Sequence, residues 1–277
     1  MATATLLTAV AHAGELQTAS IGPIKDNSLV EIDDGSLSLA LSEFILAGRV
    51  GNVGGNQKLR RGLIAFDVAA ALPPDATVQS VQLSMFCVMT NSGDHPVSLH
   101  SALEDWGEGS SFGPGGAGAP ATPGDATWLH TFWPGALWTV EGGTFAEAPS
   151  ATTTVGLPGA YAWSSPGLVA DVQSWLDSPA VNFGWMVIGG EPVVQSVKAF
   201  ASRENIVVEQ RPVLTITYTL RATIVGDLDD DGMVSSSDLA LLLGAWGRCG
   251  APCAADLDRD GFVGAPDLSI LLGAWSL

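Results

Sequence analysis

Aspartates recur at alternate positions in two short stretches near the end of the 277-residue sequence. The first stretch begins at Asp227 and the second at Asp256, so their starts lie 256 − 227 = 29 residues apart. Each stretch carries carboxylates at its first, third, fifth and twelfth positions and a glycine at its sixth. A tightly curled loop of this kind turns several hard oxygen atoms toward one centre, and calcium prefers such ligands. The pattern therefore predicts two calcium loops of the EF-hand type.

The predicted ligands are the carboxylates, the backbone carbonyl at the seventh position and, in the first loop, a serine at the ninth. In the first loop they are Asp227, Asp229, Asp231, Met233, Ser235 and Asp238. In the second loop they are Asp256, Asp258, Asp260, Phe262 and Asp267. Gly264 occupies the ninth position of the second loop and has no side chain, so we expect a water ligand there. Two Ca2+ ions are the predicted cofactors.

Each predicted loop leads into an apolar pattern with helical spacing. The first pattern consists of Leu239, Leu242, Leu243 and Trp246, and the second consists of Leu268, Leu271, Leu272 and Trp275. One short helix cannot bury such a stripe alone, so we expect the two helices to pack against each other. The calcium loops begin these helices, and we therefore expect folding of this segment to require calcium.

The two loop-helix units, over residues 222–277, resemble the type I dockerin module. In that family, recognition of a cohesin partner depends largely on loop positions ten and eleven. These positions hold Ser236-Ser237 in one copy and Ala265-Pro266 in the other, so the two recognition faces differ. The linker over residues 247–253 is similar to that of a cysteine-bearing dockerin variant found on secreted, surface-retained bacterial proteins. The resemblance implies a cohesin-like partner or a cell-surface anchoring partner.

The three cysteines are too few for a disulfide scaffold. Cys249 and Cys253 are close enough in sequence to form a bridge, which would suit an oxidising compartment. A disulfide and two free thiols both remain open at this point. Cys87 lies in an apolar stretch, and we expect it to be a buried thiol.

Residues 21–221 predict a mainly β domain, an antiparallel β-sandwich. Short alternating stretches such as Val81 to Met89 are separated by turn residues. The helical pattern in this region covers residues 165–176, with Ser165 as its N-cap and Pro166 at the first helical position. Regular short strands separated by turns, with one helix, favour a sandwich.

Several motifs in this region look, in order, like those of the DNRLRE domain. They are Asp26-Asn27-Ser28-Leu29, Ala47-Gly48-Arg49, residues 60–67, Asp105-Trp106-Gly107-Glu108-Gly109, Asp125-Ala126-Thr127-Trp128, Asn182-Phe183-Gly184-Trp185, Ser202-Arg203-Glu204-Asn205 and Arg211-Pro212. The family is a jelly-roll-like β-sandwich grouped with the carbohydrate-binding modules of family ninety-six, found beside polysaccharide lyases. The resemblance implies a jelly-roll-like sandwich over residues 24–220 and a polysaccharide as the partner.

Two sets of residues are candidates for contact with a polysaccharide. Trp128, Trp133 and Trp138 could stack on sugar rings, and Arg49, Lys58, Arg60 and Arg61 could pair with the carboxylates of an acidic polysaccharide. Each set has a structural alternative. The tryptophans could instead clamp loops onto the sandwich, and the cations could form ion pairs within the domain.

An acidic group in a glycine-rich stretch leaves an enzymatic alternative open. Glu104, Asp105 and Glu108 could form the acid pair of a polysaccharide-degrading enzyme or hold a further metal ion, but sequence does not give their separation. His95, His100 and His130 are scattered and match no catalytic motif. We therefore expect a non-catalytic binding protein, with a polysaccharide-degrading enzyme and a structural surface protein as alternatives.

The charge and the hydropathy pattern narrow the classes of partner. The formal net charge of −18 argues against nucleic-acid binding. No apolar run reaches the eighteen residues of a membrane-spanning helix. Residues 1–20 are a candidate leader, because Leu6 to Ala13 is apolar and ends in Ala11-His12-Ala13. Together with the predicted calcium loops, this predicts a secreted, extracellular or surface-associated protein.

Overall fold

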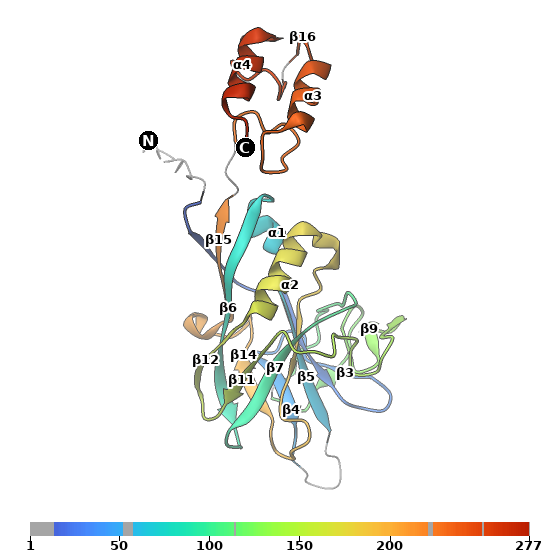
Figure 1. Ribbon diagram of the computed structural model, residues 1–277. Coiled ribbons are helices and arrows are strands. Elements are labelled where there is room, and N and C mark those ends of the chain that lie inside the picture. The colour runs from blue at the N-terminus through green and yellow to red at the C-terminus, as the bar shows by residue number, and fades with distance from the viewer. Residues whose placement is uncertain (1–13, 52–57, 114, 221–223, 251, 277) are drawn as a thin grey trace, which may run out of the picture. The chain divides into compact units, whose positions relative to one another are not determined.

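The computed structural model describes residues 14–51, 58–113, 115–220, 224–250 and 252–276. The chain divides into two compact units, with boundaries between Glu15 and Leu16 and between Tyr218 and Thr219. Figure 1 shows the chain from its N-terminus to its C-terminus. The larger unit extends from Leu16 to Tyr218 and is mainly β, and the smaller one contains two helices. Residues 1–13 of the predicted leader lie outside the described residues. None of the helices in the described ranges is long and apolar enough to cross a membrane.

Most strands of the larger unit belong to one eleven-stranded sheet. Its path joins β1 (Gln17–Ile21), β15 (Val213–Leu220), β6 (Ala76–Thr90), β14 (Lys198–Ala201), β4 (Phe44–Arg49), β5 (Leu59–Ala65), β13 (Trp185–Ile188), β7 (His95–Ser101) and β11 (Ala151–Val155). Two further strands, β2 (Lys25–Val30) and β12 (Gly159–Ser164), pair with β5 and β6. Short pairs are formed by β3 (Leu37–Ser38) with β8 (Ala119–Pro120) and by β9 (His130–Phe132) with β10 (Ala136–Leu137).

The large sheet is antiparallel and curls, so that distant strands of the path approach each other (Figure 1). Trp163 of β12 shows this, because its indole N–H donates to the carbonyl of Val97 in β7 at 2.8 Å. Trp163 also packs edge-on against Phe200 of β14, with ring centroids 5.7 Å apart. The core lies inside the curl, and the prediction of a mainly β, antiparallel domain is confirmed.

One end of the sheet lies within the range of the predicted leader. Strand β1 starts at Gln17, and each of its residues pairs with β15, from Gln17 opposite Tyr218 to Ile21 opposite Leu214. Residues 17–20 are therefore part of the folded domain. The range of the predicted leader, residues 1–20, thus overlaps this edge strand, and a leader over residues 1–13 stays a prediction.

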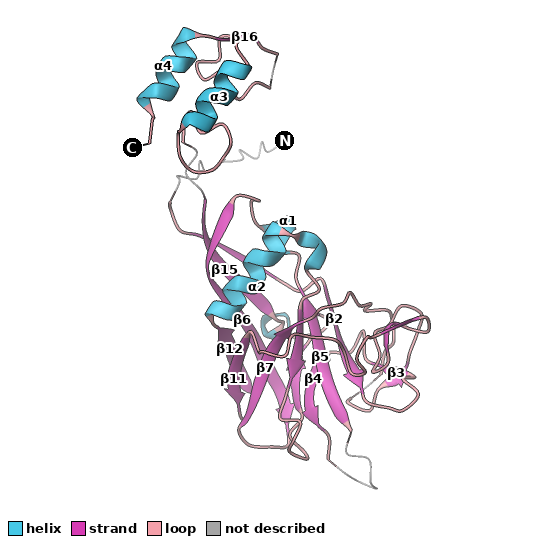
Figure 2. Cartoon of the chain, turned by 45° about the vertical axis from the view of Figure 1, so that its right-hand side comes forward, coloured by secondary structure: helices cyan, strands magenta, loops and turns pink. Residues whose placement is uncertain are grey.

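The predicted helix at residues 165–176 is confirmed as α2 (Pro166–Asp177). The Ser165 hydroxyl accepts from the amide of Leu168 at 3.1 Å, which satisfies one of the amides left free at a helix start. Its buried face includes Trp175, whose ring centroid lies 4.5 Å from that of Trp185 in β13. In Figure 2, α2 lies across the strands. The other short helices described in the larger unit are α1 (Val68–Ala71), η1 (Pro179–Val181) and η2 (Val208–Gln210).

The smaller unit contains α3 (Ser236–Gly244) and α4 (Ala265–Gly273), joined through the short paired strands β16 (Gly247–Arg248) and β17 (Phe262–Val263). Its core consists of Val234, Leu242, Ala255, Val263 and Leu271. The predicted apolar stripes are only partly buried. Leu239, Leu268 and Trp275 pack against the core, whereas Leu243, Leu272 and Trp246 are half exposed, at 51%, 52% and 50%. The valines at the eighth loop positions fill the space that these side chains were expected to occupy.

Candidate metal centres

The first aspartate of each loop is held by backbone amides of its own loop. The Asp227 carboxylate accepts from the amides of Asp231 at 3.1 Å and Gly232 at 2.9 Å. In the second loop, the Asp256 carboxylate accepts from the equivalent amides of Asp260 and Gly261. The loops can turn back this sharply because Gly232 and Gly261 both adopt a φ of 91°, in the left-handed region that favours glycine. The local backbone therefore folds as the repeated sequence predicts.

The twelfth residue of each loop ties the loop to the first turn of its helix. The Asp238 carboxylate is buried and accepts from the amides of Leu228 at 2.7 Å and Ser235 at 2.8 Å. Asp267 is equally buried and accepts from Leu257 at 2.7 Å and Gly264 at 2.7 Å. Each carboxylate thus closes its loop while keeping one oxygen near the other aspartates.

Three carboxylates gather in each loop. One oxygen from each of Asp227, Asp229 and Asp238 lies within 4.8 Å of the other two, and the same holds for Asp256, Asp258 and Asp267. Asp231 and Asp260 each accept from the amide two residues later at 2.8 Å, and both lie beside these groups, close enough to raise the pKa of Asp229 and Asp258. The side chains of Met233 and Phe262 are about half exposed, at 54% and 53%, which is compatible with ligation through their carbonyls. Ser235 serves as the N-cap of α3.

The charges within each group of three oppose one another. Burial raises the pKa of Asp229, and repulsion from Asp231, Asp238 and Asp227 raises it further, against one backbone hydrogen bond. Burial also raises the pKa of Asp238, but amides that include those of Ser235 and Leu228 outweigh it and leave the pKa below its usual value. In the second loop, the pKa of Asp258 is likewise raised and the pKa of Asp267 is likewise lowered. Among the described residues, no lysine or arginine forms an ion pair with either group, so these oxygens fit a divalent cation.

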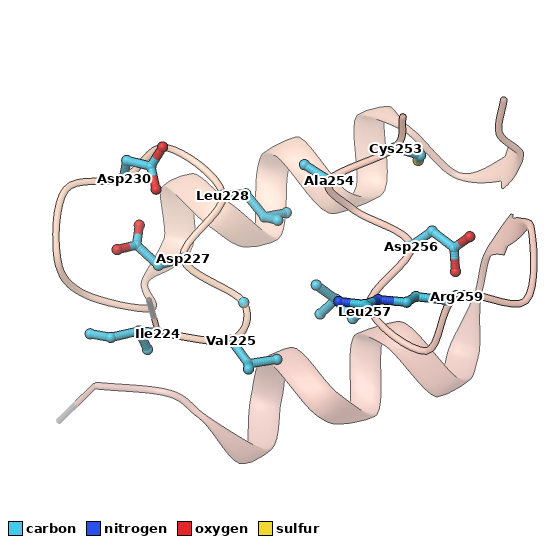
Figure 3. Close-up of a pocket in the computed structure, with 11 residues that line it drawn as sticks. Ile224, Val225, Asp227, Leu228, Asp230, Cys253, Ala254, Asp256, Leu257 and Arg259 are labelled. Carbon is cyan, nitrogen blue, oxygen red and sulfur yellow. The ribbon is translucent and has the colours of Figure 1, made fainter. Parts of the chain in front are cut away.

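A hollow of about 390 Å3 lies between the two loops (Figure 3). It is lined by residues at equivalent positions of the two repeats, such as Asp227 with Asp256 and Leu228 with Leu257. The repeats differ at the fourth position, where Asp230 faces the hollow from one loop and Arg259 from the other. The two loops are thus similar in their carboxylates and different in their surroundings.

The short segment that follows the helix of each repeat pairs with the loop of the other repeat, and we call this segment a strap. The straps are Ser276 after α4 and Gly247–Arg248 after α3. In the first loop, Val234 exchanges hydrogen bonds with Ser276, at 2.9 and 3.0 Å. In the second loop, Val263 pairs with Gly247, which is the equivalent of Ser276 because 276 − 247 = 29. The second strap leads directly into Cys249, which forms a disulfide with Cys253.

The candidate sugar platform is not present in the structure. Trp128 and Trp138 are buried, with 8% and 5% of their surface exposed, and only Trp133 is partly exposed. The Trp138 indole N–H donates to the carbonyl of Thr127 at 2.9 Å, which fixes this loop against the domain. The prediction of a flat three-tryptophan surface is wrong, because two of the three rings fill a core cluster.

The four candidate cations are engaged within the domain. Arg61 forms an ion pair with Glu191 at 2.7 Å and lies over the Trp128 ring, 4.9 Å from its centroid. Arg60 is buried and donates to the carbonyl of Gly116, and Arg49 donates to the carbonyl of Glu191. Lys58 pairs with Asp33 at 2.8 Å. The alternative of internal pairing therefore describes these four residues, and their contact with an acidic polysaccharide stays a prediction.

The acidic residues of the enzymatic alternative do not form one site. Glu104 accepts from the amide of Thr139, and Asp105 pairs with Lys25 at 2.7 Å. Glu108 receives two hydrogen bonds from the Arg203 guanidinium, at 2.8 and 2.7 Å.

Glu108 instead belongs to a cluster that the sequence analysis missed. One oxygen of Glu108 lies within 4.8 Å of one from Asp26 and one from Glu204. Asp26 is buried and accepts from the amide of Arg203 at 2.8 Å. Burial raises the pKa of Asp26 well above its usual value, and the neighbouring Glu204 and Glu108 add to this effect against the Arg203 amide. The signal available in the sequence was that Asp26, Glu108 and Arg203 all lie in motifs of the DNRLRE resemblance.

Comparison with known proteins leaves the family open. No protein-family model matches this chain, and no curated protein matches it either.

Proposed function

We propose that the Thr219–Leu277 unit is a dockerin-like module that binds one Ca2+ in each loop and attaches a secreted protein to a partner. The observation that carries this proposal is the gathering of three carboxylates twice, in the same frame, without a cationic partner among the described residues. Bringing like charges together raises the free energy of the fold unless a cation offsets their repulsion. A divalent ion in each loop would supply that offset.

The residues that would hold the first ion are Asp227, Asp229 and Asp238, with the carbonyl of Met233. Asp256, Asp258, Asp267 and the carbonyl of Phe262 would hold the second. Bound calcium would remove the repulsion and fix both loop ends against α3 and α4. Folding of this unit then depends on calcium, as is usual for small metal-bound domains.

The outer faces of the two helices support a role in attachment. Leu241, Leu243, Trp246 and Leu272 are exposed by 47% to 52% of their surface. Several large apolar side chains exposed on one small unit are consistent with a protein-binding surface. We propose that a cohesin-like protein or a cell-surface anchoring partner covers this surface.

For the larger unit we propose a jelly-roll-like fold of the DNRLRE kind. We also propose that this unit has a binding role and no catalytic role. Its candidate acid pair is divided among separate contacts, as Glu104, Asp105 and Glu108 bind different partners. Polysaccharide binding rests here on the resemblance alone, because the tryptophans and cations expected to provide it are engaged internally. Affinity electrophoresis in gels containing acidic or neutral polysaccharides, with calcium present, tests it, and unchanged mobility in every gel would exclude it.

Isothermal titration with calcium tests the proposed module. The wild-type chain should bind two ions, and Asp229→Asn and Asp258→Asn should each remove one. Asp230→Asn is the matched control, because Asp230 lies in the first loop outside the group of three carboxylates. This control should still bind two ions. A wild-type chain that takes up no calcium would refute the proposal.

A further inference from the structure

We propose that the Cys249–Cys253 disulfide positions the second calcium loop for binding, and that its reduction weakens the second site while leaving the first unchanged. This inference rests on the proposed function of the loops. It goes beyond it by assigning a role to the cysteine pair and by making the two sites unequal.

The two half-cystines of the disulfide contact the second loop at two different places. Cys253 precedes Asp256, the first residue of the loop, and the carbonyl of Cys253 accepts from the Asp256 amide at 3.3 Å. On the other side, the amide of Cys249 donates to the carbonyl of Gly261 at 3.2 Å. The bridge therefore connects the beginning of the loop to the residue at which it turns.

The strap before Cys249 extends this connection to the seventh and eighth loop positions. Arg248 pairs with Phe262, and Gly247 pairs with Val263, in the short ladder of β16 and β17. The Arg248 guanidinium also lies over the Phe262 ring, 6.0 Å from its centroid. Phe262 is the residue whose carbonyl is a predicted ligand. A covalent link at the end of this strap thus limits the movement of Asp256 and Phe262 together.

The first loop has the same strap and lacks the link. Ser276 pairs with Val234, as Gly247 pairs with Val263. The chain has three cysteines, and the third, Cys87, is a buried free thiol of the other unit. A loop that is already ordered loses less conformational freedom when it binds an ion, so the link should favour calcium at the second site alone.

Reduction is a defined chemical step. A dithiol reductant breaks the S–S bond and is itself oxidised to a disulfide, while Cys249 and Cys253 each become a thiol. Because Cys87 is unpaired, the bond between Cys249 and Cys253 is the one that the reductant acts on. The ligands of both loops are otherwise unchanged.

The test measures calcium affinity one site at a time in the full chain. Asp229→Asn leaves the second site, and its calcium dissociation constant should rise about tenfold with dithiothreitol, equal to about 1.4 kcal/mol. Asp258→Asn leaves the first site, whose constant should stay within about twofold. Adding Cys249→Ser and Cys253→Ser to the Asp229→Asn chain should give the weak affinity with or without reductant. Circular dichroism at saturating calcium verifies that each chain is folded.

The outcomes separate this inference from the proposed function. If the oxidised wild-type chain binds no calcium, the proposed function and the inference both fail. If it binds two ions and reduction changes neither affinity, the inference alone is overturned. It is also overturned if both sites weaken equally, because the disulfide would then act on the unit as a whole.

Discussion

The chain holds two kinds of carboxylate cluster, and they differ in how their charge is neutralised. In the larger unit, the guanidinium of Arg203 contacts Glu108 and Glu204, and the backbone amide of Arg203 donates to Asp26. In the smaller unit, each group of three aspartates has backbone amides for partners and, within the described ranges, no ion pair with an arginine or lysine. In every one of these groups, one oxygen from each residue lies within 4.8 Å of the others. The comparison teaches that proximity of carboxylates is weak evidence for a metal ion until the nearby cations have been considered.

Calcium removal should give the largest contrast between the two units. With calcium at a hundred times its dissociation constant, each site should stabilise the smaller unit by about 2.7 kcal/mol. A chelator should therefore unfold residues 224–276 while the eleven-stranded sheet remains folded. Hydrogen exchange of the full chain, with calcium and with chelator, measures both units in one sample. Equal loss of protection in both units would contradict the comparison.

Arg203→Ala should have the next largest effect, in the larger unit. It removes the guanidinium that pairs with Glu108 and Glu204, beside the buried Asp26. Breaking a buried pair costs about 3–5 kcal/mol, but 35% of the Arg203 side chain is exposed, so we expect about 2 kcal/mol. Urea unfolding measures this loss.

Arg203→Lys is the matched control for that variant. It keeps the charge but cannot make the two parallel hydrogen bonds to Glu108, so its loss should be smaller than that of alanine. Equal losses for lysine and alanine would show that charge is not what Arg203 contributes.

The pH dependence of Asp26→Asn gives a finer test. Because the pKa of Asp26 is raised in the folded state, its protonated form is favoured there, and stability decreases as pH rises through the folded-state pKa. Asparagine cannot lose this proton. The stability of Asp26→Asn relative to wild type should therefore increase from acidic to alkaline pH. Urea unfolding at several pH values measures the difference, and a constant difference would contradict the assignment.

Glu204→Gln should have the smallest effect. Glu204 shares Arg203 with Glu108, and its buried Oε2 atom has no hydrogen-bond partner. Burial, and to a smaller extent the charge of Glu108, raise its pKa against the pull of Arg203. Neutralising it should change the free energy of unfolding by less than about 1 kcal/mol. Glu108→Gln disturbs both hydrogen bonds from Arg203 to Glu108, so it should lower the free energy of unfolding by more. The reverse order would show that Arg203 pairs mainly with Glu204.

Features with a local sequence pattern could be predicted. Ser165 and Pro166 mark the start of α2, and alternation over Val81 to Met89 marks β6. The turns at Gly232 and Gly261 follow from spacing within single loops. In each case the residues that decide the structure lie within one element.

Features made by distant residues could not be predicted. Arg203 and Asp26 are 177 residues apart in sequence, so neither indicates the other. Trp128 and Trp138 lie in a segment rich in turns, where exposure was expected, but this segment folds back onto the core. Leu243 and Leu272 satisfy a helical pattern and are nevertheless exposed, because Val234 and Val263 of the loops fill the small core.

The exchange of straps between the repeats has a consequence for biosynthesis. Val234 obtains its hydrogen bonds from Ser276, 42 residues further along the chain. During translation, the first loop therefore emerges from the ribosome long before the segment that closes it. The second loop meets its closing segment, Gly247–Arg248, as soon as it is made. Once calcium is present, the second loop should thus find its closing segment nearer along the chain than the first loop does, whatever the order of translation.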